Sequence, residues 1–207
     1  MRTEATRPGE FLLSEGPGAI SRDRGTIAAN LALDAGTVLG KRTKGTSATV
    51  TADSGNTGDG TVGSISLGNK SLFGDYVVTF IEPAADSGQF SVEDPNGKNI
   101  GTGTVGSQFQ KEGMTFTISD GATDFVAGDR FVISVNEGTG EFAEYDPSAA
   151  DGTERAAALL YEPVDTSDGA AADALVIARM AEADGDQLTG LDAAAEGQLA
   201  EQFLIVR

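Results

Sequence analysis

The sequence contains no cysteine, no histidine and no tryptophan. A disulfide, a zinc–thiolate site, a cysteine nucleophile and a histidine general base are therefore all excluded. Ser–Lys or paired-carboxylate chemistry remains open. No apolar run approaches the roughly 18 residues needed to cross a bilayer, and the first ten residues lack the apolar centre of a signal peptide. We expect no enzyme activity, no cofactor, no metal, and synthesis in the cytoplasm without export.

Positive charge is also scarce, because 14 Lys and Arg face 32 Asp and Glu, which gives a net charge of −18. Such a surface repels the phosphates of nucleic acids and of anionic membranes, so neither is an expected partner. Residues 1–46 are the exception, with 7 basic and 5 acidic side chains. This segment either suits an acidic partner surface or carries cations that are simply solvated.

Residues 1–30 are predicted to form an extended arm. Pro8 disfavours a helix at Arg7, and the sequence Gly16-Pro17-Gly18 breaks the chain again. Between these breaks lies one short apolar run, Phe11-Leu12-Leu13. An arm of this kind packs back on its own domain or adds to a sheet edge of a neighbour. Disorder of residues 1–10 in the free protein is the alternative.

Residues 47–136 are rich in Gly, Thr, Ser and Asp and contain about six β-prone runs at a spacing of roughly 8–12 residues. The clearest runs are 76–81, 114–118 and 131–135. Asp94-Pro95-Asn96-Gly97 has the composition of a tight turn. These runs predict a β-sandwich or a small barrel, which we take as an inserted β-sandwich-like domain, and the low aromatic content of 6% argues against a large aromatic core.

Residues 137–207 give a mixed pattern. Residues 155–161 (RAAALLY) favour a helix by propensity, whereas residues 174–180 suit a strand or a helix. Residues 191–201 are predicted to be helical with Asp192 as the cap, and residues 203–206 form a closing strand.

Several motifs that suggest a binding site have simpler interpretations. Asp53 to Gly60 resembles a calcium loop but lacks the spacing of its ligands, and Asp184-Gly185-Asp186 is interpreted as a turn. Gly101 to Gly106 fits GxGxxG, yet β-like residues follow where a dinucleotide site needs a helix. The pair Glu141 and Glu144 could serve acid–base chemistry, but with 32 acids such pairs arise by chance.

The two ends of the chain together resemble the lambda-type head decoration family of tailed phages, in a long form. The resemblance is carried by residues 6–15 (TRPGEFLLSE), 21–23 (SRD), 33–40 (LDAGTVLG), 156–165 (AAALLYEPVD), 176–182 (VIARMAE) and 198–207, with the ending Leu204-Ile205-Val206-Arg207. It covers residues 1–46 and 137–207, and residues 47–136 depart from the short family members.

The resemblance implies a mainly β, compact decoration-protein core with one short C-terminal helix, built from residues 1–46 and 137–207. It also implies that residues 156–161 form a strand. The protein would be made in the host cytoplasm and would bind the major capsid protein on the outer surface of the virion. It would do so as a homotrimer at local three-fold sites, stabilising the expanded head against internal DNA pressure.

The arm residues expected to bind the capsid are Thr6, Arg7, Pro8, Phe11, Leu12 and Leu13. Two other functions are possible. The inserted domain could bind glycans or host surfaces, or the carboxylates could form a glycosidase site. The absence of Trp argues against the glycosidase, because sugar sites usually stack on aromatic rings.

Overall fold

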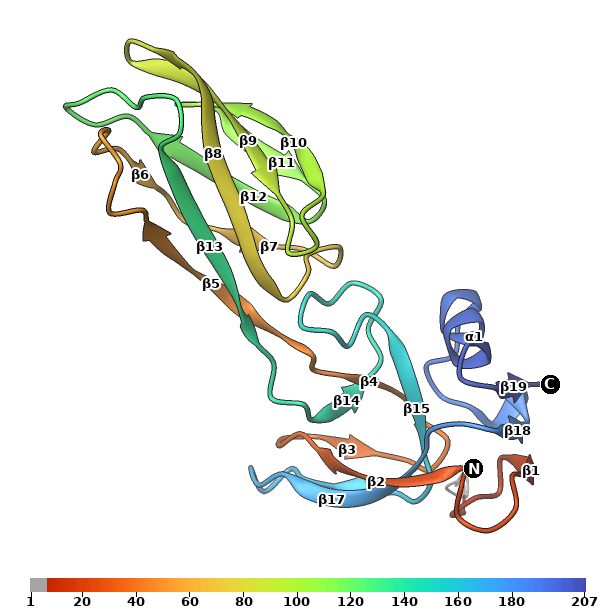
Figure 1. Cartoon of the computed structure of the whole chain (residues 1–207). Helices are drawn as coiled ribbons and strands as arrows, with labels where there is room; N and C mark the ends of the chain where they lie inside the picture. The colour runs from red at the N-terminus through yellow and green to blue at the C-terminus, as the bar shows by residue number, and fades with distance from the viewer. Residues whose placement is uncertain (1–6) are drawn as a thin grey trace. The chain divides into compact units, whose positions relative to one another are not determined.

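A computed structural model describes residues 7–207 and divides the chain into two compact units. Unit 1 contains the chain up to Thr43 and from Thr139 to Arg207, and unit 2 contains Lys44–Gly138. Figure 1 shows a mainly β chain with one short helix near its C-terminus, which confirms the predicted fold class. Within residues 7–207 no helix is long and apolar enough to cross a membrane.

Unit 1 is built from ten strands, one 3-10 helix and one α-helix among the described residues. They are β1 (Leu12–Glu15), β2 (Arg22–Ile27), β3 (Ala32–Leu33), β4 (Val38–Lys41), β14 (Phe142–Glu144), β15 (Ala156–Leu160), β16 (Val164–Asp165), β17 (Ala172–Ile177), β18 (Ala181–Ala183), η1 (Gly185–Gln187), α1 (Ala193–Ala200) and β19 (Leu204–Val206).

A small closed barrel, with strand order β14-β2-β17-β15-β4, forms the centre of unit 1. Strand β15 is buried on both faces. Leu160 belongs to one buried cluster with Ile27 and Leu39, whereas Leu159 belongs to a second buried cluster with Val38 and Leu199. A strand buried on both faces consists of continuous apolar residues and not of an alternating pattern. For this reason propensity alone favours a helix at residues 155–161, and the strand that the family resemblance implies is confirmed.

Helix α1 covers the second cluster of buried residues in unit 1. Its cap is Asp192, as predicted, and the carboxylate accepts a hydrogen bond of 2.7 Å from the backbone N–H of Ala195. The side chain of Gln198 accepts a bond of 2.7 Å from the N–H of Ala156 on β15. The cap therefore stabilises the start of the helix, and Gln198 fixes the helix to the barrel.

The segment predicted to be an extended arm is folded into unit 1 from residue 7 onward. Strand β2 closes the barrel, and β1 pairs antiparallel with β18. The side chain of Phe11 is fully buried among Val38, Leu199 and their neighbours. The backbone N–H of Gly9 donates to Tyr161 O at 2.9 Å. Of the two placements expected for the arm, residues 7–30 therefore adopt the one in which the arm packs back on its own unit, because Phe11 buries its apolar surface there.

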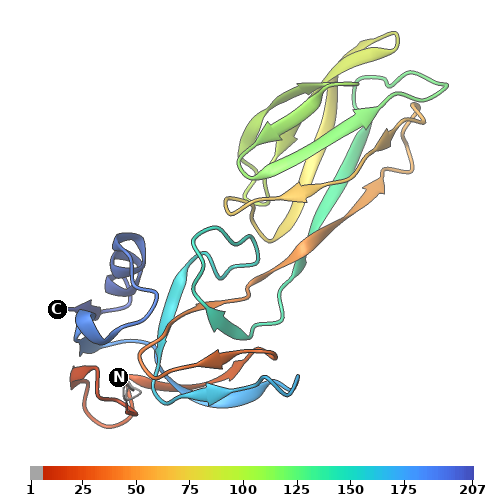
Figure 2. The ribbon, with the colours of Figure 1, turned by 180° about the vertical axis from the view of Figure 1, so that it is seen from behind.

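Unit 2 is a pair of sheets. Its strands are β5 (Lys44–Ala52), β6 (Thr61–Val62), β7 (Ser66–Leu67), β8 (Gly74–Ala84), β9 (Ser87–Glu93), β10 (Asn99–Thr104), β11 (Gln108–Lys111), β12 (Met114–Ser119) and β13 (Arg130–Glu137). One sheet has the order β10-β9-β8-β13-β5, and the other joins β11, β12 and β6, with β7 also pairing to β12. Figure 2 shows the same strands from behind.

The two sheets of unit 2 enclose a phenylalanine-rich core. Six of the ten phenylalanines lie in this cluster, together with Tyr76. Phe80 stacks on Phe125 with ring centroids 3.9 Å apart, and Phe90 contacts rings of the facing sheet. The expectation of an aromatic-poor core is therefore wrong, because the few aromatic residues are concentrated in one unit.

Two loops of unit 2 are joined through the buried carboxylate of Asp129. It accepts hydrogen bonds of 3.0, 2.9 and 3.0 Å from the backbone N–H groups of Thr57, Gly58 and Val126. Burial alone would raise the pKa of Asp129, but these donors outweigh burial and lower the pKa below its ordinary value. The segment 53–60 is thereby fixed by a structural carboxylate.

We expect Phe11→Ala to lower the free energy of unfolding by about 3–5 kcal/mol, because it opens a cavity in the core of unit 1. Urea unfolding followed by circular dichroism measures the change. Leu13→Ala is the control, since Leu13 is 55% exposed two residues away. Equal, small effects of both substitutions would contradict the anchoring role of Phe11.

We expect Asp129→Asn to destabilise the protein by about 1–3 kcal/mol at pH 7, since it replaces a carboxylate that accepts three bonds. The folded-state pKa is lowered, so this stabilisation is present above the unfolded-state pKa. It is lost as the pH falls from there through the folded-state pKa. Urea unfolding from pH 7 to pH 2 should therefore show the variant and the parent converging below about pH 4. Glu82→Gln, at an exposed site of the same unit, should follow the parent throughout; a constant gap for Asp129→Asn would contradict this role.

Candidate functional site

The three-stranded sheet of unit 1, with order β1-β18-β19, packs one side on α1, whereas the side chains of the other side are exposed or half-buried among residues 7–207, and we call this the bare side. On the covered side Ala181, Ala183 and Leu204 are buried against Ala195 and Leu199 of α1. Alternation along the strands turns the intervening side chains outward. The bare side is therefore the outward face of a sheet whose other face packs in the core of unit 1.

Glu182 lies at the middle of the bare side, and its charge is balanced. The carboxylate accepts a hydrogen bond of 2.7 Å from the guanidinium of Arg207 and one of 3.0 Å from Ser14 Oγ. Arg207 and then Ser14 lower the pKa of Glu182 below its usual range. The outward centre of the sheet thus carries an ion pair and no net charge.

Five large apolar side chains are exposed on β1, on β19 and in the turns next to the strands, and we call them the apolar patch: Leu13, Ile20, Met180, Phe203 and Ile205. Phe203 is 73% exposed and Leu13 is 55% exposed. The side chain of Ile20 lies against Gly16, whose N–H donates to Met180 O at 2.9 Å. Exposed apolar residues on neighbouring segments are typical of an interaction surface.

Two residues of the apolar patch adopt a left-handed backbone conformation. Met180 has φ 50° and Phe203 has φ 59°. The N–H of Ala181, which follows Met180, donates to Phe203 O at 3.2 Å, so the two turns lie side by side. Such a conformation costs a non-glycine residue about 1–3 kcal/mol and is concentrated at functional sites. Here the strain orients two large apolar side chains into solvent.

Ion pairs border the apolar patch on several sides. Arg22 forms two hydrogen bonds to Glu15, of 2.9 and 2.7 Å, and its guanidinium lies 4.5 Å from the ring centroid of Tyr161. Arg179 pairs with Asp23. In a chain of net charge −18, this region is locally neutral.

The six predicted arm residues differ in their exposure to solvent. Arg7, Pro8 and Leu13 are exposed, and Leu12 is half-buried. Phe11 is fully buried and therefore holds the segment in place without offering a contact surface. Thr6 lies outside the described residues. Of the predicted set, Leu13 joins the apolar patch.

Sequence reasoning missed Met180 and Phe203 as surface residues. Neither is a glycine or an asparagine, which are the residues that signal a left-handed conformation. The alternation of residues 203–206 was a partial signal, because a strand that buries Leu204 turns Ile205 outward. It does not apply to Phe203, which lies in the left-handed turn before β19.

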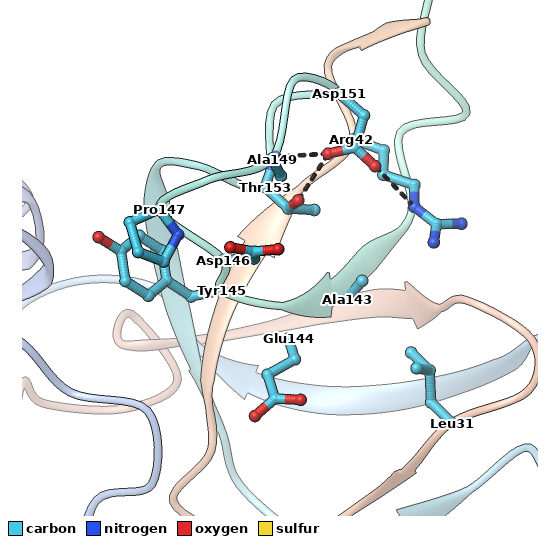
Figure 3. Close-up of a pocket in the computed structure, with 10 residues that line it drawn as sticks. All are labelled: Leu31, Arg42, Ala143, Glu144, Tyr145, Asp146, Pro147, Ala149, Asp151 and Thr153. Atoms are coloured by element: carbon cyan, nitrogen blue, oxygen red, sulfur yellow. Dashed lines mark hydrogen bonds and ion pairs between the residues drawn. The ribbon is translucent and has the colours of Figure 1, made fainter. Parts of the chain in front are cut away.

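Unit 1 also contains a shallow pocket of about 480 Å³, shown in Figure 3. Arg42 pairs with Asp151 at 3.3 Å on its wall, and Asp151 in turn accepts bonds from the N–H and hydroxyl of Thr153. Burial opposes ionisation of Asp151, but Thr153 and Arg42 lower its pKa below the ordinary value. The side chain and backbone of Ser148 likewise lower the pKa of Asp146.

Both of these carboxylates are ionised at neutral pH and are therefore poorly suited to act as general acids. The candidate pair of Glu141 and Glu144 is placed differently from an acid–base pair. Glu141 pairs with Arg42 at 3.5 Å, whereas Glu144 lines the pocket and points away from Arg42 in Figure 3.

The candidate cation loops are occupied by structural hydrogen bonds. Asp53 accepts from the N–H of Gly55, and Asp184 caps η1. Gly101 to Gly106 lies in β10 and the turn after it, as predicted. A group that the sequence did not indicate is Asp86, Asp120 and Asp124, whose carboxylates lie within 4.8 Å of one another. Exposed acidic groups of this kind do not by themselves define a cation site.

Comparisons with known proteins assign the family. Residues 1–204 match the family described as bacteriophage lambda head decoration protein D, and the match runs through the segment 47–136. No curated protein matches the chain. Among solved structures, flagellar FlgL of Xanthomonas campestris is 26% identical over 50% of this chain, with a TM-score of 0.35. The flagellar hook junction protein FlgK of Burkholderia pseudomallei is 24% identical over 61% of this chain, also with a TM-score of 0.35.

The chain covers only 33% of that FlgL chain and 21% of that FlgK chain, and these TM-scores are too low to support an argument about fold or function. The family match, in contrast, extends over nearly the whole chain. The chain belongs to the lambda head decoration protein family, and it is a structural protein of the phage capsid.

Proposed function

We propose that the protein binds the outer surface of the expanded phage head as homotrimers at local three-fold sites. There it contacts the major capsid protein and stabilises the shell against the pressure of the packaged DNA. Family membership supports a capsid decoration role. The observation that carries the finer proposal is the apolar patch on the bare side of the β1-β18-β19 sheet.

The apolar patch has the composition of a protein contact. Burying its side chains yields about 25 cal/mol per Å² of apolar surface removed from water. Phe203 is the most exposed residue of the apolar patch and is the best candidate for its main anchor, since aromatic residues often dominate the binding energy of an interface. The Arg22–Glu15 and Arg179–Asp23 ion pairs supply a polar rim, and the Glu182–Arg207 pair balances the charge within the contact.

The N-terminal segment contributes contacts beside the apolar patch. Arg7, Pro8 and Leu13 are exposed, and we place them, with Thr6, in contact with the capsid. Ordering a free segment costs about 1–2 kcal/mol for each residue. Because Phe11 and Gly9 already fix this segment to unit 1, part of that cost is met before binding.

Trimerisation would raise the affinity that one modest contact provides. When one patch of a trimer is bound, the other two meet the lattice at high effective concentration, which raises the overall affinity without any new contact. Closed three-fold symmetry also matches a local three-fold site of the shell. The glycan-binding alternative gains no support, because unit 2 buries all its aromatic rings except that of Phe73.

We expect Phe203→Ser to reduce binding to expanded capsids at least tenfold, because it removes the main apolar anchor. Co-sedimentation of the purified chain with undecorated heads measures the affinity. Phe73→Ser is the matched control, since Phe73 is 53% exposed on unit 2. The cooperative thermal unfolding of both variants should match the parent. Undiminished binding by folded Phe203→Ser would refute the assignment of this face.

We expect removal of residues 1–8 to weaken capsid binding while the chain stays folded, because Phe11 remains in the core. Sedimentation velocity should give three times the 21.1 kDa of one chain for both the parent and the truncated form. A truncated trimer that decorates heads as the parent does would show that the segment makes no capsid contact. A monomeric parent would contradict the proposed trimer.

A further inference from the structure

Strand β5 is an edge strand whose outer side has no partner in unit 2. It runs for nine residues, Lys44–Ala52, and pairs with β13 alone in the five-stranded sheet. Figure 1 shows it as a long strand along one border of that sheet. Within residues 7–207 no other strand extends the sheet beyond β5. An edge of this length presents a row of backbone groups that can pair with another chain.

The hydrogen bonds at the end of the strand show which backbone groups face outward. The N–H of Asp53 donates to Arg130 O at 3.1 Å, whereas Asp129 O accepts from Phe80 on the opposite side of β13. In an antiparallel ladder the residues alternate between the two sides. Since Thr51 pairs with Val132 and Thr49 with Ser134, these threonines face β13. The backbone groups of Ala48, Val50 and Ala52 therefore face outward.

This edge lacks the features that normally prevent pairing. Residues 45–52 (GTSATVTA) include no charged residue and no proline, although 22% of the chain is charged. The irregularity in its ladder lies at one end, between Val135 and Glu137. Natural proteins protect exposed edges with charges, prolines or bulges. The other edge of the same sheet, β10, has Gly101 at φ 144° and a register shift beside it.

We propose that the outer edge of β5 pairs with β5 of a second copy of this chain, antiparallel across a two-fold axis. Each chain carries a net charge of −18, so the repulsion between two copies is smallest where the segments in contact are uncharged. Residues 45–52 meet that condition on both sides of the contact. Threonine, valine and alanine pairs then face one another, with no like charges opposed.

This contact is separate from the proposed trimer contact, because a two-fold operator pairs identical surfaces and cannot close a ring of three. In a trimer, the β5 edge would therefore join one trimer to a neighbouring one. The pairing needs neither the capsid nor the apolar patch, so its failure and the failure of capsid binding are measured separately.

The absence of cysteine allows a direct test on the full chain. Ser47→Cys, Thr49→Cys and Thr51→Cys each place one thiol on an exposed position of β5. A disulfide forms only where the two Cα atoms are about 4.4–6.8 Å apart. Mild oxidation should therefore give a covalent dimer that is most abundant at one of the three positions, the one nearest the two-fold axis. Thr104→Cys, exposed on the opposite edge strand β10, is the control.

A second substitution tests the backbone pairing itself. In the best cross-linking background, Val50→Pro removes an outward N–H and leaves the ladder bonds of Thr49 and Thr51 to β13 in place. It should lower the dimer yield at least tenfold, whereas Val50→Thr should keep it. If Val50→Pro does not fold, Val50→Lys gives the same readout, because the pairing brings two like charges together. No dimer at any of the three positions, or a yield no higher than that of Thr104→Cys, would overturn the proposal.

Discussion

The burial of Phe11 is the contact on which the functional face depends. Its side chain fills the space between the barrel and the β1-β18-β19 sheet, where Val38 and Leu204 belong to the same buried cluster. This places β1 beside β18 and so brings residues near the N-terminus against residues near the C-terminus. Without it, Leu13 would not lie on the strand beside Glu182, and the bare side of the sheet would lose one of its three strands. A single apolar side chain thereby couples the stability of unit 1 to the surface that it presents.

That surface combines local strain with local neutrality. Met180 and Phe203 keep a left-handed backbone conformation because the neighbouring strands fix it. The burial of the next residue in each case, Ala181 and Leu204, offsets the free energy that this conformation costs. Glu182 is neutralised by Arg207 and Ser14 in the middle of the same face. An acidic protein can present an apolar contact surface only where its own charges are balanced, and this sheet meets that condition.

The sequence allowed prediction of features that depend on neighbouring residues and failed for features that depend on distant ones. The Asp94–Gly97 turn and the Asp192 cap follow from local chemistry, and both are present. The sequence left open whether the arm packs on its own domain or on a neighbour, because no residue close in sequence shows that Phe11 will pack against Leu199, almost 190 positions away. Likewise, residues 156–160 are helical by propensity and become a strand because the barrel buries both of their faces.

The net charge of the chain limits which surfaces of either unit can contact another copy. A net charge of −18 opposes every approach of one copy to another, so contacts must be confined to neutral surfaces. Each unit offers one such surface: the apolar patch of unit 1, balanced by ion pairs, and the uncharged edge of β5 in unit 2. The first uses side-chain burial and suits a partner with a complementary pocket, whereas the second uses backbone hydrogen bonds and suits an identical strand. Repulsion between copies at all other surfaces would leave only the two proposed contacts, at the apolar patch and at β5. Such a restriction favours an ordered array over non-specific aggregation, as a capsid decoration protein requires.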